Sequence, residues 1–369
     1  MNKSIFSIIF AALLLIMKKQ ETQPNGFMRK FKKRNIITYI LASIAASVII
    51  IYVAIYLAVP SYRFEDPVPF KGRFIYNPYQ NLAETKWQYL DFRNDTYEKI
   101  QLPVYEYGYG VFPIRYLCID YESKRKIDYA FFQNIHYKQY NINCLNKNCG
   151  LVVPAHPSKG FKIREMKHLD NYRVLEVLSP LGKHLDYWDM ALSSGRRVNI
   201  LASNMFDAED DFVSKTVVNQ VDDDKKSVIS SLKNGDSYAI TYKKNNIDIP
   251  ELRSVDLHND TVFVTASKMI NEIRFIGQDG MLKDSLIDVN QGVYAFSDDD
   301  TYVRVEMNFD DGTTIYLNPL VRHEFQYFFD PALTTMMKAR TWLMRFVYIF
   351  AFVFFVKYLL FNRKEENAA

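Results

Sequence analysis

A stretch of 24 residues without a charged side chain, from Ile36 to Val59, constrains this 369-residue chain more than any other feature. As an α-helix it would be about 36 Å long, which is enough to cross a bilayer. Five basic residues precede it at positions 29–34, and basic flanks mark the cytoplasmic side of a membrane helix. Because no small-residue cleavage site follows, we interpret the stretch as an anchor and not as a signal peptide. A helix buried in a protein core is the alternative.

A second apolar and aromatic stretch, from Trp342 to Phe361, predicts another transmembrane helix. Arg345 and Lys357 lie near its ends, where long cationic side chains can reach the lipid headgroups. An amphipathic helix on the membrane surface is the alternative. With residues 1–35 in the cytoplasm, the intervening chain would lie on the outer side of the membrane. Because a new basic-then-apolar start follows Met28, we expect translation to begin there, with a genuine short hydrophobic segment before it as the alternative.

The chain between these stretches, about 280 residues, is long enough for two compact domains. The protein has 27 Phe and 26 Tyr but only 13 Gly and 13 Pro, so we expect packed cores and little disorder. Its net charge of +4 is small, and its clearest basic cluster is the membrane flank. The composition therefore predicts no nucleic-acid partner and makes the membrane the first partner to expect.

Three cysteines bear on the compartment. Cys144 and Cys149 are five positions apart and, by this topology, lie outside the cytoplasm, where disulfides persist. We therefore expect a local Cys144–Cys149 disulfide, with Cys118 left single. The four-residue gap between the pair and the lack of a second pair argue against a zinc site.

The first predicted domain, residues 70–245, mixes strands with helices. Gly108–Ile114 and Gly150–Val153 have the composition of short buried strands that lead into loops. Ser227–Lys233 predicts a short helix, which Gly235 is placed to end. Alternation of strands and helices favours an α/β arrangement of barrel type.

The second predicted domain, residues 246–323, has the pattern of a small β-sandwich. Turn signals of the Asn-Asp and Asp-Gly type separate segments that alternate in polarity or are rich in β-branched and aromatic residues. The predicted strands are Leu252–Leu257, Thr261–Thr265, Glu272–Ile276, Val293–Phe296, Tyr302–Asn308 and Thr314–Leu317.

Five patterns in this order resemble the polymerase-and-histidinol-phosphatase (PHP) superfamily of metallohydrolases, above all a bacterial branch in which a β-sandwich follows the catalytic barrel. The resemblance implies an α/β fold, a PHP-like distorted (β/α) barrel followed by a small β-sandwich, here flanked by N- and C-terminal transmembrane helices. Taken with the two predicted spans and the basic flank at positions 29–34, it predicts a bacterial inner-membrane protein with most of the chain on the periplasmic side. The patterns are Gly150–Pro157, Arg173–Glu176, Trp188–Val198, Ser227–Ala239, and Tyr302–Glu306 with Asp310–Gly312 and Asn318–Pro319.

PHP enzymes hold divalent metal with histidines and carboxylates, and the resemblance places most of those positions on other residue types. His156, within Ala155-His156-Pro157, and Glu176 match two of the family's ligands. Asp95 and Asp207 fall at or near two further ligand positions as substitutes. The ligand positions with other residue types are Arg93, Tyr116, Leu117 and Asn204.

Arg93 conflicts most with a metal. Its guanidinium cannot be deprotonated, and at about 5 Å with an effective dielectric near 20 it would repel a divalent ion by roughly 6 kcal/mol. We expect it to pair with Asp95, Glu176 or Asp207 instead and to fill the pocket with salt bridges. An anion site around Arg93, suited to phosphate or carboxylate, is the alternative.

We therefore predict a membrane-anchored, catalytically degenerate PHP-like protein that binds or scaffolds without a cofactor. Its partner would be another envelope protein, with an anionic small molecule as an alternative ligand. The alternative function is a metal-dependent phosphoesterase that binds Zn, Mn or Fe through a reduced site, with His156 and Glu176 as the catalytic candidates. That reduced site would consist of Asp95, His156, Glu176 and Asp207. A structural or inhibitor-like subunit of a larger assembly is a third possibility.

Overall fold

The computed structural model describes residues 53–80, 87–92, 102–129, 133–204, 211–219, 224–324 and 333–366. The chain divides into two compact units. The terminal unit consists of Met1–Ser61 and Lys338–Ala369, and the central unit consists of Tyr62–Met337.

In the terminal unit, helix α7 (Lys338–Glu366) is hydrogen-bonded to the end of the segment Met1–Ser61. The Arg345 guanidinium donates hydrogen bonds to the carbonyls of Leu57 and Ala58, at 2.9 and 3.0 Å, and the Ser61 amide donates to Thr341 Oγ1 at 3.0 Å. Arg345 therefore binds backbone carbonyls within its own unit, where we had expected it to reach towards lipid headgroups.

The predicted membrane topology needs correction. Among the described helices, α7 included, none combines the length and the apolar character that crossing a bilayer requires. This finding contradicts the predicted span at residues 342–361 and the predicted inner-membrane localisation. Most of the other predicted span, residues 36–52, lies outside the described residues.

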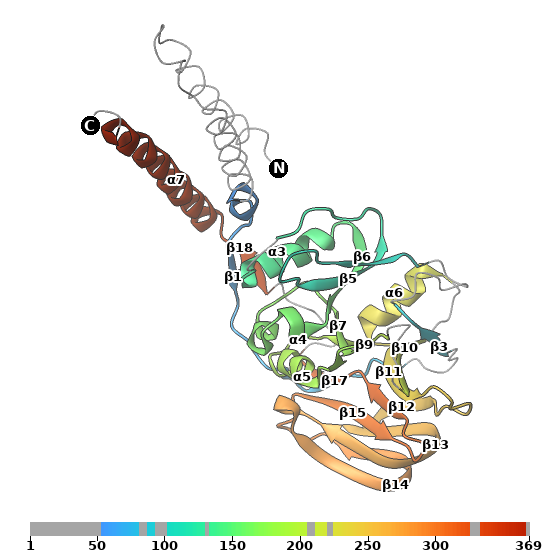
Figure 1. Ribbon diagram of the computed structural model, residues 1–369. Helices are drawn as coiled ribbons and strands as arrows, with labels where there is room; N and C mark the ends of the chain where they lie inside the picture. Colours follow the sequence, from blue (N-terminus) through green and yellow to red (C-terminus); the bar gives the residue numbers. More distant parts are fainter. Residues whose placement is uncertain are drawn as a thin grey trace. The chain divides into compact units, whose positions relative to one another are not determined.

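The central unit is built mainly from strands (Figure 1). Its largest sheet has ten strands, seven of them in the order β12-β13-β15-β16-β11-β10-β3. Strand β14 pairs with β13, and β17 pairs with both β15 and β2. The bounds are β2 Phe74–Tyr76, β3 Trp87–Leu90, β10 Phe212–Asn219, β11 Ser237–Lys243, β12 Leu252–His258, β13 Thr261–Ile276, β14 Leu282–Ala295, β15 Tyr302–Asn308, β16 Thr314–Leu317 and β17 Leu320–His323.

Three smaller sheets and several short helices complete the central unit. The sheets have the orders β4-β5-β6, β8-β7-β9 and β1-β18. Helix α3 lies along the β4-β5-β6 sheet, and its Ile142 and Leu145 share a core with Val152 of β6 (Figure 1). The bounds are β1 Tyr62–Phe64, β4 Val104–Tyr107, β5 Arg115–Tyr121, α3 Ile135–Leu145, β6 Cys149–Ala155, α4 Pro157–Gly160, η2 Ile163–Lys167, β7 Val174–Ser179, β8 Gly182–Lys183, α5 Leu185–Ser193, β9 Asn199–Ala202, α6 Lys225–Asn234, η3 Gln278–Gly280 and β18 Thr334–Met336.

The predicted (β/α) barrel is wrong. A barrel of that type needs a closed ring of parallel strands, whereas among the described strands only β7 and β9 pair in parallel. Strands β4, β5, β6, β7, β9 and β10 do surround a common apolar core, but their hydrogen-bonded ladders belong to separate sheets. The segment Gly108–Ile114, predicted as a strand, is the turn between β4 and β5. It turns because Gly108 has φ 133°, and a Cβ there would lie 2.6 Å from the Ile114 carbonyl oxygen.

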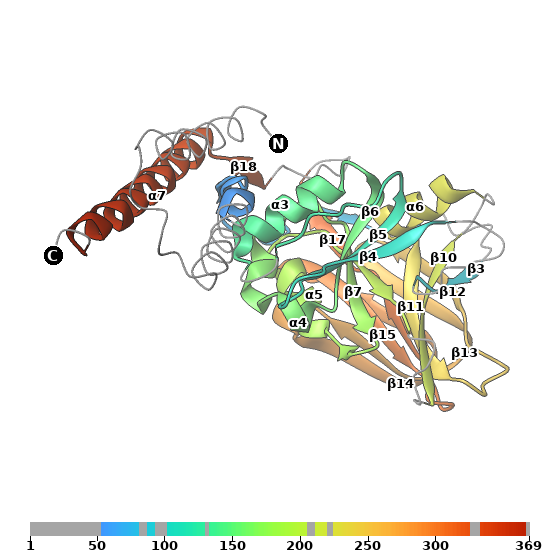
Figure 2. The same cartoon turned by 45° about the horizontal axis from the view of Figure 1, so that its top comes forward.

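The strand pattern of the second half agrees with the structure more closely. Strands β15 and β16 have the predicted bounds, and two predicted strands, Thr261–Thr265 and Glu272–Ile276, form the single long strand β13. Asn259 and Asp260 both have left-handed backbones, with φ 47° and 59°, as a tight hairpin turn requires. Figure 2 shows β13, β14 and β15 side by side. Because β11 pairs with β16, one sheet contains strands from both predicted domains, and the boundary at residue 245 stays a prediction.

A buried ion cluster joins helix α5 to this sheet. The guanidinium of Arg304, on β15, donates to both carboxylate oxygens of Asp189, on α5, at 2.7 and 2.9 Å. Glu306 accepts from the same guanidinium, and the Trp188 ring lies 5.2 Å from its central carbon. The cluster is an internal ion pair with bidentate geometry, which is the arrangement that best repays desolvation.

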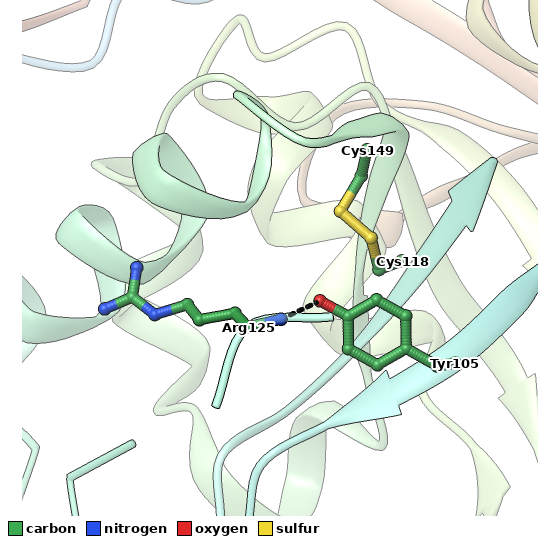
Figure 3. Close-up of a disulfide and its surroundings, with 4 residues drawn as sticks. All are labelled: Tyr105, Cys118, Arg125 and Cys149. Carbon is green, nitrogen blue, oxygen red and sulfur yellow. Dashed lines mark hydrogen bonds between the residues drawn. A yellow bond between two sulfur atoms is a disulfide. The ribbon is translucent and has the colours of Figure 1, made fainter. Parts of the chain in front are cut away.

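The disulfide joins different cysteines from those expected. Cys118 on β5 is bonded to Cys149 at the start of β6, and Cys144 is a free thiol (Figure 3). The reason is that β5 and β6 are neighbouring strands and both cysteines face the same core, whereas Cys144 lies within α3 and is hydrogen-bonded to Arg125. The Arg125 amide also donates to the Tyr105 hydroxyl beside the disulfide, at 3.2 Å (Figure 3).

Candidate functional site

Polar side chains from four strands meet around His156. His156 directly follows β6, whose residues from Leu151 to Ala155 are all buried, so the strand end is held firmly in the core. Its backbone is left-handed, with φ 45°, and Pro157 after it begins the short helix α4. This conformation is uncommon for a residue with a side chain, and it turns the imidazole and the amide of His156 towards β7. The residues around it are Glu106 on β4, Arg115 on β5, Glu176 on β7 and Ser203 after β9.

Glu176 is the most enclosed member of this group, which we call the His156 cluster. It is fully buried. Its Oε2 accepts a hydrogen bond from the His156 amide at 2.7 Å and lies 3.5 Å from His156 Nδ1. Its Oε1 accepts from the Ser203 hydroxyl. Both carboxylate oxygens therefore have donors, as a charge in a dry core requires.

Glu106 occupies the other side of the imidazole. Its Oε2 lies 3.7 Å from His156 Nε2, and its Oε1 pairs with the guanidinium of Arg115. Both residues belong to the β4–β5 hairpin, where Glu106 is opposite Leu117 and Arg115 lies two positions before Leu117, and the Arg115 side chain is 42% exposed. Arg115 therefore brings a permanent positive charge to the solvent side of the cluster.

The pKa of His184, at the start of α5, is affected by the charge of Glu176. Burial lowers the pKa of His184 below its ordinary value, and the Glu176 carboxylate partly offsets this effect. His184 Nε2 lies 3.0 Å from Ser179 Oγ. At neutral pH the His184 ring is thus an uncharged neighbour of the cluster and adds no further cation.

The structure brings together two of the residues predicted from sequence, His156 and Glu176. Arg93, Asp95 and Asp207 lie outside the described residues, so their predicted pairing stays a prediction. Sequence reasoning missed three members of the cluster. Glu106 carries a signal, because it is the one charged residue between the buried Tyr105 and Tyr107 of β4. Arg115 and Ser203 have no such signal in the sequence. The three members that were not predicted are therefore Glu106, Arg115 and Ser203.

The described residues of the cluster do not fit a catalytic metal. Within the described ranges, no three or more His, Cys, Asp or Glu side chains are grouped so that they could hold an ion. The donor geometry gives the reason, because only two of these donors, Glu106 and His156 Nε2, lie on the same side of the imidazole, and Glu176 lies at the other ring nitrogen. A catalytic metal site usually needs three protein ligands, and Glu106 already pairs with Arg115.

Comparisons with known proteins give one weak likeness. No protein-family model matches the chain, and no curated protein matches it. Among solved structures, the chain is similar to a two-domain protein from Bacteroides vulgatus that contains a predicted PHP-like metal-dependent phosphoesterase. The two are 10% identical, the match covers 64% of this chain and 74% of that one, and the TM-score is 0.30. This likeness gives the chain a PHP-like structural neighbour and carries no argument about its activity.

Proposed function

We propose that the central unit is a catalytically degenerate PHP-like domain that acts by binding a partner or ligand and does not hydrolyse one. The observation that carries the proposal is the internal pairing of the His156 cluster. Glu176 is satisfied by the His156 amide and the Ser203 hydroxyl, and Glu106 is paired with Arg115. The sequence pattern places metal ligands at His156 and Glu176, and these side chains instead make contacts within the protein.

The pairing of Arg115 strengthens the proposal. Its guanidinium already binds a carboxylate oxygen of Glu106, so a metal at this place would have to compete with a permanent cation for that carboxylate. The sequence suggested such a conflict for Arg93, and Arg115 supplies a cation of the same kind from a described residue.

A phosphoesterase with a reduced metal site is the competing proposal. One feature favours it, because Glu176 beside Nδ1 of His156 resembles the carboxylate that orients a metal-binding imidazole in many enzymes. In that case Nε2 of His156 would have to bind the ion beside Glu106, and the Glu106–Arg115 pair would have to open.

The experiment is to measure metal content and phosphoester hydrolysis of the purified full chain. We expect less than about a tenth of an equivalent of zinc, manganese or iron and no hydrolysis of a phosphomonoester or phosphodiester, because Glu106 and Glu176 already have donors within the protein. Arg115→Met serves as a matched variant, since removal of the cation tests whether it alone blocks the metal. Stoichiometric metal, with hydrolysis that His156→Ala and Glu176→Gln abolish and His258→Ala keeps, would overturn the proposal.

A further inference from the structure

A second basic site lies apart from the His156 cluster, where Arg196 follows helix α5. Arg196 is only 4% exposed. Its Nε donates to the Lys167 carbonyl at 2.9 Å, while its Nη2 is buried and has no hydrogen-bond partner among the described residues. Within the described part of the chain, no carboxylate lies within ion-pair distance of this guanidinium. A buried cation in this state is strongly unfavourable unless something neutralises it.

The nearest acidic side chain is already used. Asp170 acts on Arg196 only through the longer-range attraction of its charge. Its Oδ2 accepts from the Leu333 amide at 2.8 Å, and its Oδ1 accepts from the Asn171 amide at 2.8 Å. Burial lowers the pKa of Arg196, and Tyr172 and then Asp170 offset only part of that effect.

His168 adds a second nitrogen to the same place. Its Nδ1 is buried and has no hydrogen-bond partner in the part of the chain that the structure describes, and its ring is hydrogen-bonded to the Glu65 backbone. Burial and the neighbouring charges of Arg196 and Lys167 lower the pKa of His168. The cationic Arg196 and the neutral imidazole of His168 are therefore neighbours here, with the charge of Lys167 close to them.

The segment before β2 lies against Gly195 and His168. Gly195 has φ 72°, and a Cβ at this position would lie 2.0 Å from the Val68 carbonyl oxygen. Such contact requires glycine and holds the backbone of Arg196 against the crossing segment. The Phe64 ring packs edge-on against His168 at 6.2 Å. The site is thus built from fixed backbone, and the partly buried His168 lies on its outer side.

We propose that Arg196 and His168 form a binding site for a small oxyanion, a phosphate or carboxylate group, that is separate from the His156 cluster. Two fixed N–H donors of a guanidinium suit the paired oxygens of such a group, and a buried, unneutralised cation strengthens their attraction. A phosphate that keeps one proton can also donate a hydrogen bond to neutral His168 Nδ1. The site needs nothing from the proposed function, because none of its residues belongs to the His156 cluster.

The test compares anions on the full chain at constant ionic strength. Inorganic phosphate, sulfate and acetate are titrated against chloride, with the unfolding midpoint and isothermal calorimetry as readouts. Phosphate or acetate should raise the midpoint with a saturating dependence, since a ligand that binds only the folded state stabilises it. The preferred anion distinguishes a phosphate source from a carboxylate source.

Single-residue variants test whether the anion binds at Arg196 and His168. Arg196→Met should weaken binding of the preferred anion at least tenfold, and Arg196→Lys, which keeps the charge and loses the fork, should weaken it less. His168→Gln should weaken it several-fold. Arg197→Met is the matched control, because the Arg197 guanidinium stacks on the Tyr76 ring at 5.0 Å and belongs to a different contact. Equal responses to chloride and phosphate, or an unchanged response in Arg196→Met, would overturn the proposal.

Discussion

Arg304 and Arg196 are two arginines of the central unit that are buried to almost the same degree, with 3% and 4% of each exposed. Arg304 is held at both ends of its fork by Asp189 and further by Glu306, and these carboxylates raise its pKa above the ordinary value despite its burial. Arg196 has one backbone acceptor, and burial lowers its pKa. Two arginines that are equally buried therefore have pKa shifts in opposite directions, and the difference comes from their interaction partners.

This difference in partners distinguishes a buried charge that stabilises the fold from a buried charge that could bind a ligand. A bidentate, neutralised guanidinium joins two parts of the fold and has no capacity left for a ligand. A guanidinium that is buried but not neutralised is a liability for stability that a bound anion would relieve. The His156 cluster is closer to the Arg304 case, because Glu106 is ion-paired with Arg115 and both oxygens of Glu176 accept hydrogen bonds within the protein.

Breaking the Arg304 pair should have the largest effect. Asp189→Asn leaves a buried guanidinium without its main counter-charge and should lower the free energy of unfolding by about 3–5 kcal/mol. Urea denaturation of the full chain measures this. Asp186→Asn on the same helix α5 is the control, because Asp186 is exposed. Equal losses in the two variants would show that the pair does not stabilise the fold as the comparison requires.

The three cysteines allow a similar comparison, because Cys118 and Cys149 are bonded to each other and Cys144 is a free thiol. Cys118→Ala with Cys149→Ala removes a bridge between residues 31 positions apart and should destabilise the chain by about 2–4 kcal/mol. Cys144→Ala should lose less than the double variant, since only a thiol contact to Arg125 disappears. Peptide mapping without reduction should recover Cys118 joined to Cys149. A Cys144–Cys149 peptide would contradict the observed pairing.

Arg196→Met should behave unlike any change at Arg304. In a buffer of chloride alone, an apolar side chain of similar length should leave the stability equal to or above that of the parent, because no ion pair is lost and a buried, unneutralised charge is removed. Arg304→Met, measured in parallel, should lose about 3–5 kcal/mol. Similar losses in both variants would erase the distinction between the two arginines.

Asp236 provides an acidic counterpart with a smaller effect. Burial raises its pKa to about 6, from an ordinary value of 3.8. The folded state therefore favours the protonated carboxyl, and this contribution to stability is complete below pH 3.8 and lost as the pH rises through about 6. Asp236→Asn should match the parent near pH 3.5 and exceed it at pH 7.5, by less than about 1 kcal/mol because the group is partly exposed. A variant less stable at pH 7.5 would contradict this sign.

Local patterns predicted the elements better than their assembly. Strand β15 and the helix ended by Gly235, whose φ is 93°, follow from residue types within a few positions. The closed barrel and the Cys144–Cys149 bridge were wrong because both depend on which strands become neighbours. Cys118 reaches Cys149 only through the β5–β6 pairing, which no short spacing reveals.

The candidate site shows the same division. His156 and Glu176 were found because a short motif marks them, and the fold does bring them within 3.5 Å. Glu106 and Arg115 enter through an antiparallel hairpin whose turn we had predicted as a strand. Arg196 was visible in the sequence as half of an Arg-Arg pair, but its isolation from carboxylates depends on tertiary structure.

The most direct test of the central claim, that the carboxylates of the His156 cluster are bound within the protein and do not hold a metal, is a metal titration of folding stability. The unfolding midpoint of the metal-stripped full chain is measured with and without about 1 mM Mn²⁺ or Zn²⁺, where any ion bound with micromolar affinity would add roughly 4 kcal/mol. We predict that metal leaves the midpoint of the parent unchanged, and that His156→Ala, with or without metal, differs from the parent only through the loss of its side chain. A metal-dependent rise of several degrees in the parent that His156→Ala and Glu176→Gln both abolish would contradict the account.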